Sequence, residues 1–307
     1  ENGVLHVVYY HAAKRTLEHV VRAPDGGWSN AKTVDGSAGD LGSYASMKLD
    51  ANGRPAVAYF DATVGDLKFA SYDGDNWIVS RIDAPGIAGL YPSLAFDIEG
   101  KPAISYYHKT RGDLRLARHD GSAWNISTVD STSDVGRHTT LAMDSGGRLA
   151  IAYENTTNGT LKYAVLKSSG WSRNTVDNTL LGGASWKSLA FDDDDRPNIS
   201  YYDAHPADLK FARLNDGKWQ TQVLATRGAV GLYSTLLFND DGDANLMYYN
   251  RQVNELHRFR GSFDNWTHDV LQTGGGRFAA ATLSPDGDGL TYAWFEPADN
   301  RLHVGDA

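Results

Sequence analysis

The sequence predicts an all-β fold built from about seven copies of one four-stranded unit, and three observations support this prediction. An apolar segment resembling PAxxYYD, followed by one resembling DLKFA, recurs about every 47 residues along the whole chain. After each of the first six copies, a tryptophan opens a segment in which polar and apolar residues alternate. Short turns rich in Gly, Asp and Asn separate these segments, and no helical periodicity competes with the alternation.

The seven copies align on an apolar strand with a polar end and on a leucine that follows it. They are Val7–His11 with Leu17, Pro55–Asp61 with Leu67, Pro102–His108 with Leu114, Leu149–Asn155 with Leu161, Pro197–Asp203 with Leu209, Ala244–Asn250 with Leu256, and Thr291–Glu296 with Leu302. The tryptophans are Trp28, Trp77, Trp124, Trp171, Trp219 and Trp266.

Each complete unit contains four expected strands, a to d, which the third unit illustrates. Strand a is SLAFD (93–97), strand b is PAISYYH (102–108), strand c is DLRLA (113–117), and strand d runs from Trp124 to Asp130. The a–b, b–c and c–d connections are short and suit antiparallel hairpins, whereas the d–a connection is longer. Three hairpins followed by a longer crossover, at a period in the 40s, are typical of the blade of a β-propeller.

The two ends of the chain carry incomplete units. The first unit lacks strand a, and the last unit, Phe278–Asp306, lacks strand d. We therefore expect a single propeller domain over residues 1–307, with seven blades of four antiparallel strands and incomplete terminal blades. Six blades with spare strands are the alternative.

Composition limits the classes of partner. The 307 residues are 41% hydrophobic, which is enough for a packed core. The net charge of −9 makes nucleic acid and anionic membranes poor partners, and no apolar stretch approaches the roughly 20 residues that span a bilayer. The absence of cysteine excludes disulfides and thiolate metal sites. The many aromatic residues and glycines favour a secreted or extracellular protein.

Three features carry a resemblance to known proteins: the repeat length, the aromatic residue just before strand a, and the Tyr-Tyr-Asp or Tyr-Tyr-His end of strand b. By these features the whole chain resembles the broad group of six- and seven-bladed propellers with repeats of 40 to 50 residues. That group includes fungal and bacterial sugar-binding lectins and propeller-type polysaccharide lyases such as ulvan lyases. The sialidase Asp-box (SxDxGxTW) and the Trp-Asp and Gly-His signatures of WD40 blades are absent, which argues against both of those families.

One edge of each blade is expected to form the working face. Because strands a and b are antiparallel, the start of a and the end of b meet there with the d–a and b–c loops, where ligands usually bind. A position at the start of strand a is predicted to form a ring around the central channel. Its residues are Tyr44, Tyr91, His138, Trp186, Tyr233 and Phe278.

Aromatic faces beside polar groups can stack on sugar rings and bind their hydroxyls. We therefore predict a lectin-like, carbohydrate-binding protein with a glycan or polysaccharide as its partner, and leave its oligomeric state open. Arg251 and Arg277 add positive charge, which favours an anionic ligand. The predicted ligand-binding residues are Tyr44, Tyr91, Trp186, Tyr202, Tyr233, Tyr249, Arg251, Arg277 and Phe278. The competing interpretation is that the aromatic residues fill space between blades and the polar residues cap turns.

The repeat also identifies departures from its own pattern, and these concentrate around residues 93 to 164. His138 replaces an aromatic residue, Arg137 precedes it, and Glu154 replaces Tyr or Phe, while Tyr107 and His108 end strand b of the preceding unit. Side chains of these types can exchange protons with a substrate, so the five residues are catalytic candidates. Propeller lyases use Tyr, His and Arg at the channel mouth, and the resemblance, which extends to residue types and not to their spacing, implies such chemistry on uronate-containing glycans. A satisfied salt-bridge network is the alternative, and a protein-interaction scaffold is a third function. Whether the protein is an enzyme is left open.

No cofactor or metal is expected. The Asp-rich turns at 192–195 and 239–243 are similar to calcium loops but lack the DxDxDG spacing with a distal Glu, so polar turn residues explain them better and calcium is the alternative. The ten histidines are scattered without an HxxxH or HxH pair, which argues against zinc.

Overall fold

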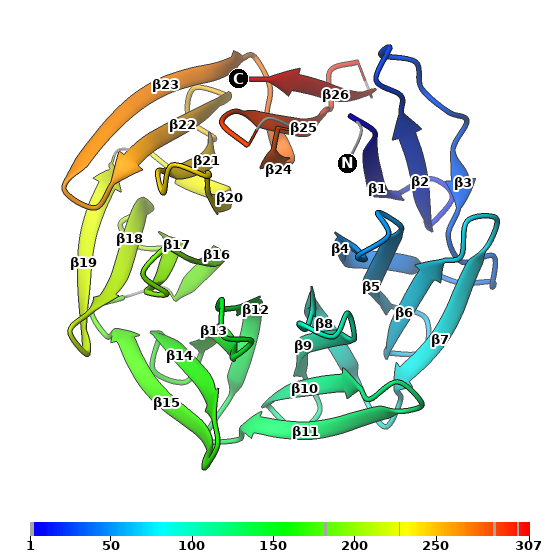
Figure 1. The fold of residues 1–307 in the computed structure, drawn as a ribbon, viewed down its shortest axis with the longest axis horizontal. Helices are drawn as coiled ribbons and strands as arrows, with labels where there is room; N and C mark the ends of the chain where they lie inside the picture. The colour runs from blue at the N-terminus through cyan, green and yellow to red at the C-terminus, as the bar shows by residue number, and fades with distance from the viewer. Residues whose placement is uncertain (1–2, 181–182, 227, 285–286, 300) are drawn as a thin grey trace. The chain divides into compact units, whose positions relative to one another are not determined.

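The computed structural model describes residues 3–180, 183–226, 228–284, 287–299 and 301–307. Over these residues the strands form seven antiparallel sheets and no helix is present (Figure 1). The predicted seven-bladed propeller with incomplete terminal blades is confirmed. Two compact units, Glu1–Leu141 and Ala142–Ala307, meet inside the strand β12 (Val135–Met143) rather than at a linker. The single domain over residues 1–307 therefore stays a prediction.

The first three blades lie in the N-terminal unit. The first blade contains strands b, c and d only: β1 (Leu5–His11), β2 (Thr16–Arg22) and β3 (Lys32–Thr33). The second blade contains β4 (Leu41–Leu49), β5 (Pro55–Asp61), β6 (Asp66–Tyr72) and β7 (Trp77–Asp83). The third blade contains β8 (Ala88–Phe96), β9 (Pro102–His108), β10 (Asp113–His119) and β11 (Trp124–Asp130).

The remaining blades continue the same order. The fourth blade is completed by β13 (Leu149–Asn155), β14 (Thr160–Lys167) and β15 (Gly170–Asp177). The fifth blade contains β16 (Ala184–Phe191), β17 (Pro197–Asp203), β18 (Asp208–Asn215) and β19 (Lys218–Ala225). The sixth blade contains β20 (Val230–Phe238), β21 (Ala244–Asn250), β22 (Glu255–Ser262) and β23 (Asn265–Thr273). The seventh blade contains strands a, b and c only: β24 (Arg277–Leu283), β25 (Leu290–Glu296) and β26 (Arg301–Asp306).

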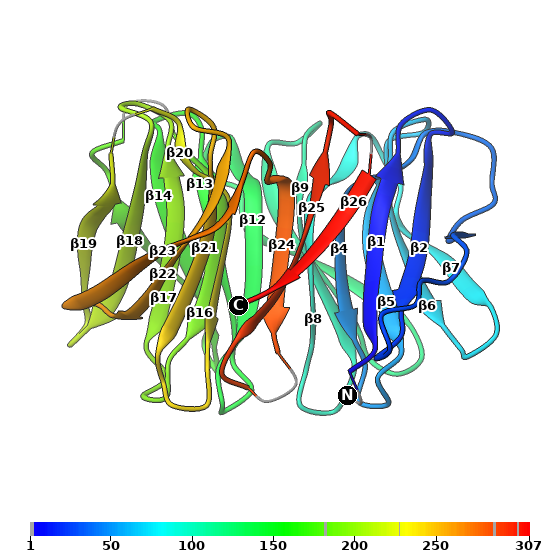
Figure 2. The same ribbon diagram turned by 90° about the horizontal axis from the view of Figure 1, so that it is seen from above.

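The strand register confirms the predicted edge of the blades. The first residue of strand a pairs with the last residue of strand b, as in Ala88 with His108 and Ala184 with Asp203. Figure 2 shows the strands from the side, with β1 and β2, strands b and c of the first blade, lying next to each other. The d–a and b–c loops therefore share one edge of each blade.

A buried hydrogen-bond group joins consecutive blades, and the fourth and fifth blades show it in full. Asp177, at the end of strand d, accepts a 2.7 Å hydrogen bond from the Tyr201 hydroxyl of the next blade. The Lys210 ammonium lies 3.3 Å from Asp177 and 2.8 Å from Asp203. Burial disfavours the charged form of Asp177, but hydrogen bonds from Thr179 and Tyr201 and the charge of Lys210 outweigh it and lower the Asp177 pKa.

The same group recurs between other blades. Its members are Asp35, Tyr59 and Lys68 between the first and second blades, and Asp83, Tyr106 and Arg115 between the second and third. We call each set an inter-blade latch. A latch pairs a buried carboxylate with both a hydroxyl donor and a cation, so its charge remains compensated inside the protein.

Close backbone contacts also join the blades. The Cα of Leu67 in β6 lies so near Gly89 that a Cβ on this glycine would be 2.6 Å from it, and Gly89 has φ +99°. Only glycine satisfies both conditions. Serines of strand a add a further link, because the Ser188 hydroxyl accepts a 3.0 Å hydrogen bond from the Leu236 amide of the next blade.

A pair of histidines is buried at the boundary of the first two blades. His19 of β2 is 4% exposed, its Nε2 lies 3.1 Å from Nδ1 of His6, and its ring meets Trp77 edge-on at 5.3 Å. Burial, followed by the nearby His6 and Lys32, lowers the His19 pKa to about 4. His19 is therefore neutral in the folded protein at neutral pH.

We expect loss of the Asp177 latch carboxylate to destabilise the protein strongly. The Asp177→Ala substitution leaves the buried Tyr201 hydroxyl without its acceptor and removes a charge partner of Lys210, so urea unfolding should show a loss of about 2–4 kcal/mol. Tyr201→Phe should cost about 1 kcal/mol. Asp194→Ala, which removes only an exposed partner of Arg196, is the control and should change stability by less than about 0.5 kcal/mol. Equal effects for Asp177→Ala and the control would contradict the latch.

We also expect stability to fall as pH decreases from about 6.5 to about 4. The His19 pKa is about 4 in the folded protein and about 6.5 in an unfolded chain, so the unfolded state binds more protons in this window and acid favours it. The loss attributable to His19 should reach about 3 kcal/mol at most. Urea unfolding between pH 7.5 and 4.5 should show a steeper decline for the native protein than for His19→Gln. Parallel declines would contradict this assignment.

Candidate functional site

The six predicted ring positions share an unusual backbone conformation. Each has a positive φ, between +41° and +58°, although none is glycine. A left-handed conformation is rare for large side chains. In five of these strands the pairing register also skips around the ring residue, as between Ser185 and Ser188, so the residue forms a β-bulge. The six ring positions thus share a left-handed backbone conformation in addition to their aromatic or histidine side chains.

The ring residues contact one another within each unit. In the N-terminal unit the ring centroids of Tyr44 and Tyr91 lie 4.5 Å apart, and those of Tyr91 and His138 lie 4.1 Å apart. In the C-terminal unit Tyr233 lies 5.6 Å from Trp186 and 5.1 Å from Phe278. Each unit therefore carries an aromatic arc, while closure of a ring around a central channel stays a prediction.

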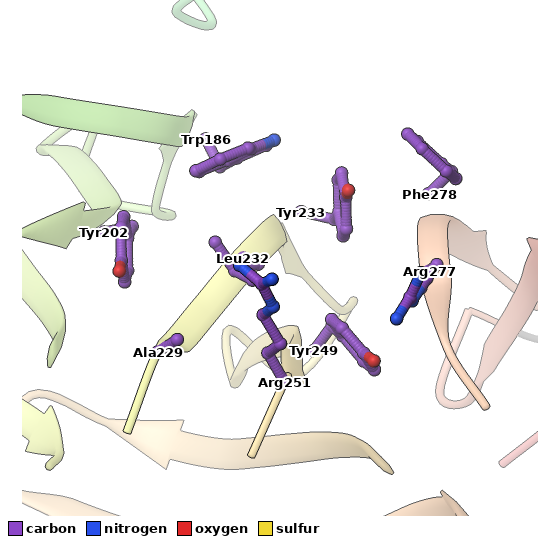
Figure 3. Close-up of a pocket in the computed structure, with 9 residues that line it drawn as sticks. All are labelled: Trp186, Tyr202, Ala229, Leu232, Tyr233, Tyr249, Arg251, Arg277 and Phe278. Carbon is purple, nitrogen blue, oxygen red and sulfur yellow. The ribbon is translucent and has the colours of Figure 1, made fainter. Parts of the chain in front are cut away.

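A pocket of about 280 Å³ opens beside the arc of the C-terminal unit (Figure 3). All predicted ligand-binding residues of this unit line it, together with Ala229 and Leu232. They are Trp186, Tyr202, Tyr233, Tyr249, Arg251, Arg277 and Phe278. The other two predicted residues, Tyr44 and Tyr91, belong to the arc of the N-terminal unit.

Two arginines provide the charge of this pocket. Arg251 follows β21, and its backbone amide donates to the Ala229 carbonyl at 3.2 Å, which joins the two loops that border the pocket. Arg277 opens β24, and a hydrogen bond with Tyr249 raises the Arg277 pKa above its ordinary value. Among the described residues, neither guanidinium forms a salt bridge. The charge of Glu296 also contributes to the raised pKa of Arg277. Two guanidinium groups without a salt bridge therefore lie among aromatic rings.

The repeat shows that Arg277 could have been neutralised. Arg137 occupies the equivalent position in the fourth blade, and its Nη2 lies 3.1 Å from the carboxylate of Asp134, three residues upstream. In the seventh blade the residue three positions before Arg277 is Gly274. The carboxylate that pairs with Arg137 therefore has no counterpart at the equivalent position beside Arg277.

Two of the predicted catalytic residues, Tyr107 and Arg137, form a small polar cluster with Asp134 in the N-terminal unit, and a third, His138, follows Arg137 in the chain. The Tyr107 hydroxyl donates to Asp134, which also pairs with Arg137, and the Arg137 guanidinium lies 5.5 Å from the Tyr107 ring centroid. Burial, aided by the hydrogen bond to Asp134, raises the Tyr107 pKa, so this tyrosine is protonated at neutral pH. His138 lies against Tyr91. The ion pair of Arg137 with Asp134 is the kind of contact expected if these residues form a salt-bridge network and not a catalytic site.

The other two catalytic candidates are buried. His108 has no exposed surface, and its Nε2 contacts the Pro85 carbonyl at 2.9 Å, so it holds a d–a loop and does not face a ligand. Glu154, in the C-terminal unit, is 8% exposed and lies near the buried Lys187. Burial lowers the Lys187 pKa, and the charge of Glu154 partly opposes this effect. Lys187 was missed by the sequence analysis, although it stands where the other units have Ala, Pro, Thr or Ser.

Most of the polar residues at the end of strand b cap turns. Asp61, Asn155, Asp203, Asn250 and Glu296 each accept a hydrogen bond from the backbone amide two residues later. The turn-capping interpretation is correct for these residues.

The Asp-rich turns are likewise capped by their own backbone. In the turn at 192–195, the Asp192 carboxylate accepts from the Asp194 and Arg196 amides. Within the residues that the structure describes, no group of three or more His, Asp or Glu side chains is arranged to hold a metal. The same residues include no helix that is long and apolar enough to cross a membrane.

Neither a protein-family model nor a curated protein matches this chain. Solved structures share its fold. A PL25 polysaccharide lyase, an ulvan lyase, is 13% identical with a TM-score of 0.69, over 99% of this chain and 89% of that one. A fucose-specific lectin from Aleuria aurantia is 16% identical with a TM-score of 0.58, over 85% and 90%. A protein of unknown function from Dyadobacter fermentans is 13% identical with a TM-score of 0.63, over 100% and 98%. Identities this low establish the propeller fold alone.

The backbone conformation of the ring positions generates a stability prediction. At Tyr44, which is half exposed and has φ +58°, substitution by Gly or by Ala removes the same ring. Tyr44→Gly should be more stable than Tyr44→Ala by about 1 kcal/mol, because alanine bears the cost of the left-handed conformation. Chemical unfolding of the two variants measures this difference. An alanine variant as stable as the glycine variant would show that the bulge relaxes once the ring is removed.

Proposed function

We propose that this propeller binds glycans in the pocket of the C-terminal unit and that its ligands carry a carboxylate or sulfate group. The observation that carries the proposal is the pair of guanidinium groups, Arg251 and Arg277, which form no salt bridge among the described residues and are surrounded by aromatic rings.

The two kinds of side chain suit the two parts of an acidic sugar. Aromatic rings such as Trp186 and Tyr233 provide flat apolar surfaces for the C–H faces of a pyranose. Guanidinium groups donate paired hydrogen bonds that match the geometry of a carboxylate or sulfate. The volume of about 280 Å³ lies near the lower end of small-molecule sites and favours a short saccharide segment.

The charge of the whole protein strengthens this interpretation. With a net charge of −9, the surface repels anions on average, so a pair of cations without a salt bridge marks a place where an anion is preferred. The carbohydrate-active fold neighbours, a lyase and a lectin, support the same class of ligand. Glycan recognition of this kind accords with a secreted or extracellular protein.

A polysaccharide lyase is the second candidate, with Tyr107, Arg137 and His138 in the N-terminal unit. The proximity of these residues favours it, but the raised Tyr107 pKa disfavours a tyrosine base, and Arg137 is already paired with Asp134. A scaffold for protein partners, the third function, has no specific observation in its favour.

Calorimetry with a uronate-containing tetrasaccharide and its carboxyl-reduced counterpart tests the proposal. We expect the acidic form to bind at least roughly tenfold more tightly, and the preference to weaken as salt increases. Arg251→Gln and Arg277→Gln should each weaken binding of the acidic form roughly tenfold and change binding of the reduced form little. Tyr233→Ala should weaken both.

Lys218→Gln is the matched control, because it removes one positive charge from an exposed residue outside the pocket. It should bind both sugars as the native protein does. Equal affinity for the two sugars would refute the anionic preference, and binding of neither would refute the glycan site. Ultraviolet absorbance of unsaturated products in the same mixtures would instead support the lyase.

A further inference from the structure

A second cavity of about 290 Å³ lies in the N-terminal unit, between the second and third blades. It opens at the edge formed by the a–b and c–d turns, and its aromatic wall includes Phe69 and Trp124, whose ring centroids are 5.2 Å apart at an interplanar angle of 64°. Ser71, Ser80 and His119 also line it. None of these residues belongs to the glycan pocket proposed above.

The equivalent place between two other blades shows which side chain can fill such a cavity. Between the fifth and sixth blades, Phe211 and Trp266 form the equivalent wall, again 5.2 Å apart and at 71°. There the phenyl ring of Phe263 packs against Phe211 at 6.0 Å and under the Arg213 guanidinium at 4.4 Å. The chain thus fills one copy of this space with its own aromatic ring.

Smaller residues leave the other copy open. The tryptophan of strand d pairs with Gly261 in the sixth blade and with His119 in the third. Two residues after that partner stands Phe263 in the sixth blade but Gly121 in the third. The repeat also places Ser71 where the fifth blade has Arg213, and Ser80 where it has Gln222, whose amide donates to the Phe263 carbonyl at 2.9 Å. The aromatic wall remains, and the His119 ring meets Trp124 edge-on at 5.3 Å. Among the described residues, no aromatic side chain packs against Phe69 as Phe263 packs against Phe211.

The rim of the open cavity carries little uncompensated charge. Asp50 and Arg54, which line it, are paired at 2.8 Å. The Tyr72 hydroxyl accepts a hydrogen bond from the Lys32 ammonium at 3.2 Å, and its ring contacts Trp77; neither partner lines the cavity. An apolar ring with few polar groups therefore suits this site better than an ion.

We propose that this cavity is a binding site for a single six-membered aromatic ring, such as a phenylalanyl side chain or a small phenol. The ring lies against Phe69 and Trp124, as that of Phe263 lies against Phe211 and near Trp266. Ser71 and Ser80 supply hydroxyls for a polar group attached to the ring.

Titration of the ¹⁵N-labelled full chain with N-acetyl-L-phenylalaninamide and, separately, with p-cresol tests this site. The indole N–H signal of Trp124, assigned with Trp124→Phe, should shift with a dissociation constant on the order of 1 mM. Stronger binding of the amide indicates a peptide-borne ring, and stronger binding of cresol indicates a free aromatic compound. Ser71→Phe should abolish the shift by filling the cavity, whereas Ser131→Phe, exposed and outside it, should not.

Phe263→Ala provides the complementary test, because removal of this ring should create a second binding site for an aromatic ring between the fifth and sixth blades. In that variant the Trp266 indole signal should also shift with the same probes, and the number of bound rings should rise from one to two. The remaining indole signals report whether each variant is folded. An unperturbed Trp124 signal in the folded native protein would overturn the proposal, as would an equal or stronger effect of methyl glucoside.

Discussion

The structure depends on the inter-blade latch, in which a carboxylate at the end of one blade bonds a tyrosine and a cation of the next. A single blade cannot bury both faces of its sheet, so each needs its neighbour. The latch makes that neighbour specific, because a buried Asp177 is tolerable only where Tyr201 and Lys210 supply its hydrogen bonds and opposite charge. Asp177 ends β15, directly before the loop that leads to β16, the strand that carries Trp186 of the candidate site.

The ring position shows how the repeat prepares a surface for binding. A regular strand would alternate its side chains between two faces, whereas the bulge at Trp186 or Tyr233 breaks the alternation and gives the residue a left-handed backbone. Such conformations cost free energy and persist where the surrounding structure enforces them, often at binding sites. Here the close packing of neighbouring blades provides that constraint at every copy of the position.

Differences between copies carry the functional information. Arg137 and Arg277 occupy one position of the repeat, but Asp134 forms a salt bridge with the first, while the second has Gly274 at the place of that aspartate. Phe263 fills one cavity between blades, while Gly121 leaves its counterpart open. In both pairs, one copy of the repeat shows that the fold tolerates a side chain that the other copy lacks. Each difference is therefore not required by the fold, and it motivates the ligand proposed for that site.

The sequence by itself favoured seven blades over six and located the incomplete ends and the aromatic ring positions, because a strand's period of two and the repeated turns are local properties. The structure decided for seven blades. The sequence also identified Trp186, Tyr233, Arg251 and Arg277, which the structure brings into one pocket. Only the tertiary structure decided that His108 is fully buried, that Asp134 forms a salt bridge with Arg137, and that Lys187 lies near Glu154. Burial and charge compensation arise between side chains brought together from different strands and loops. A pattern read along the chain places such residues on an edge, but packing decides which of them remain available.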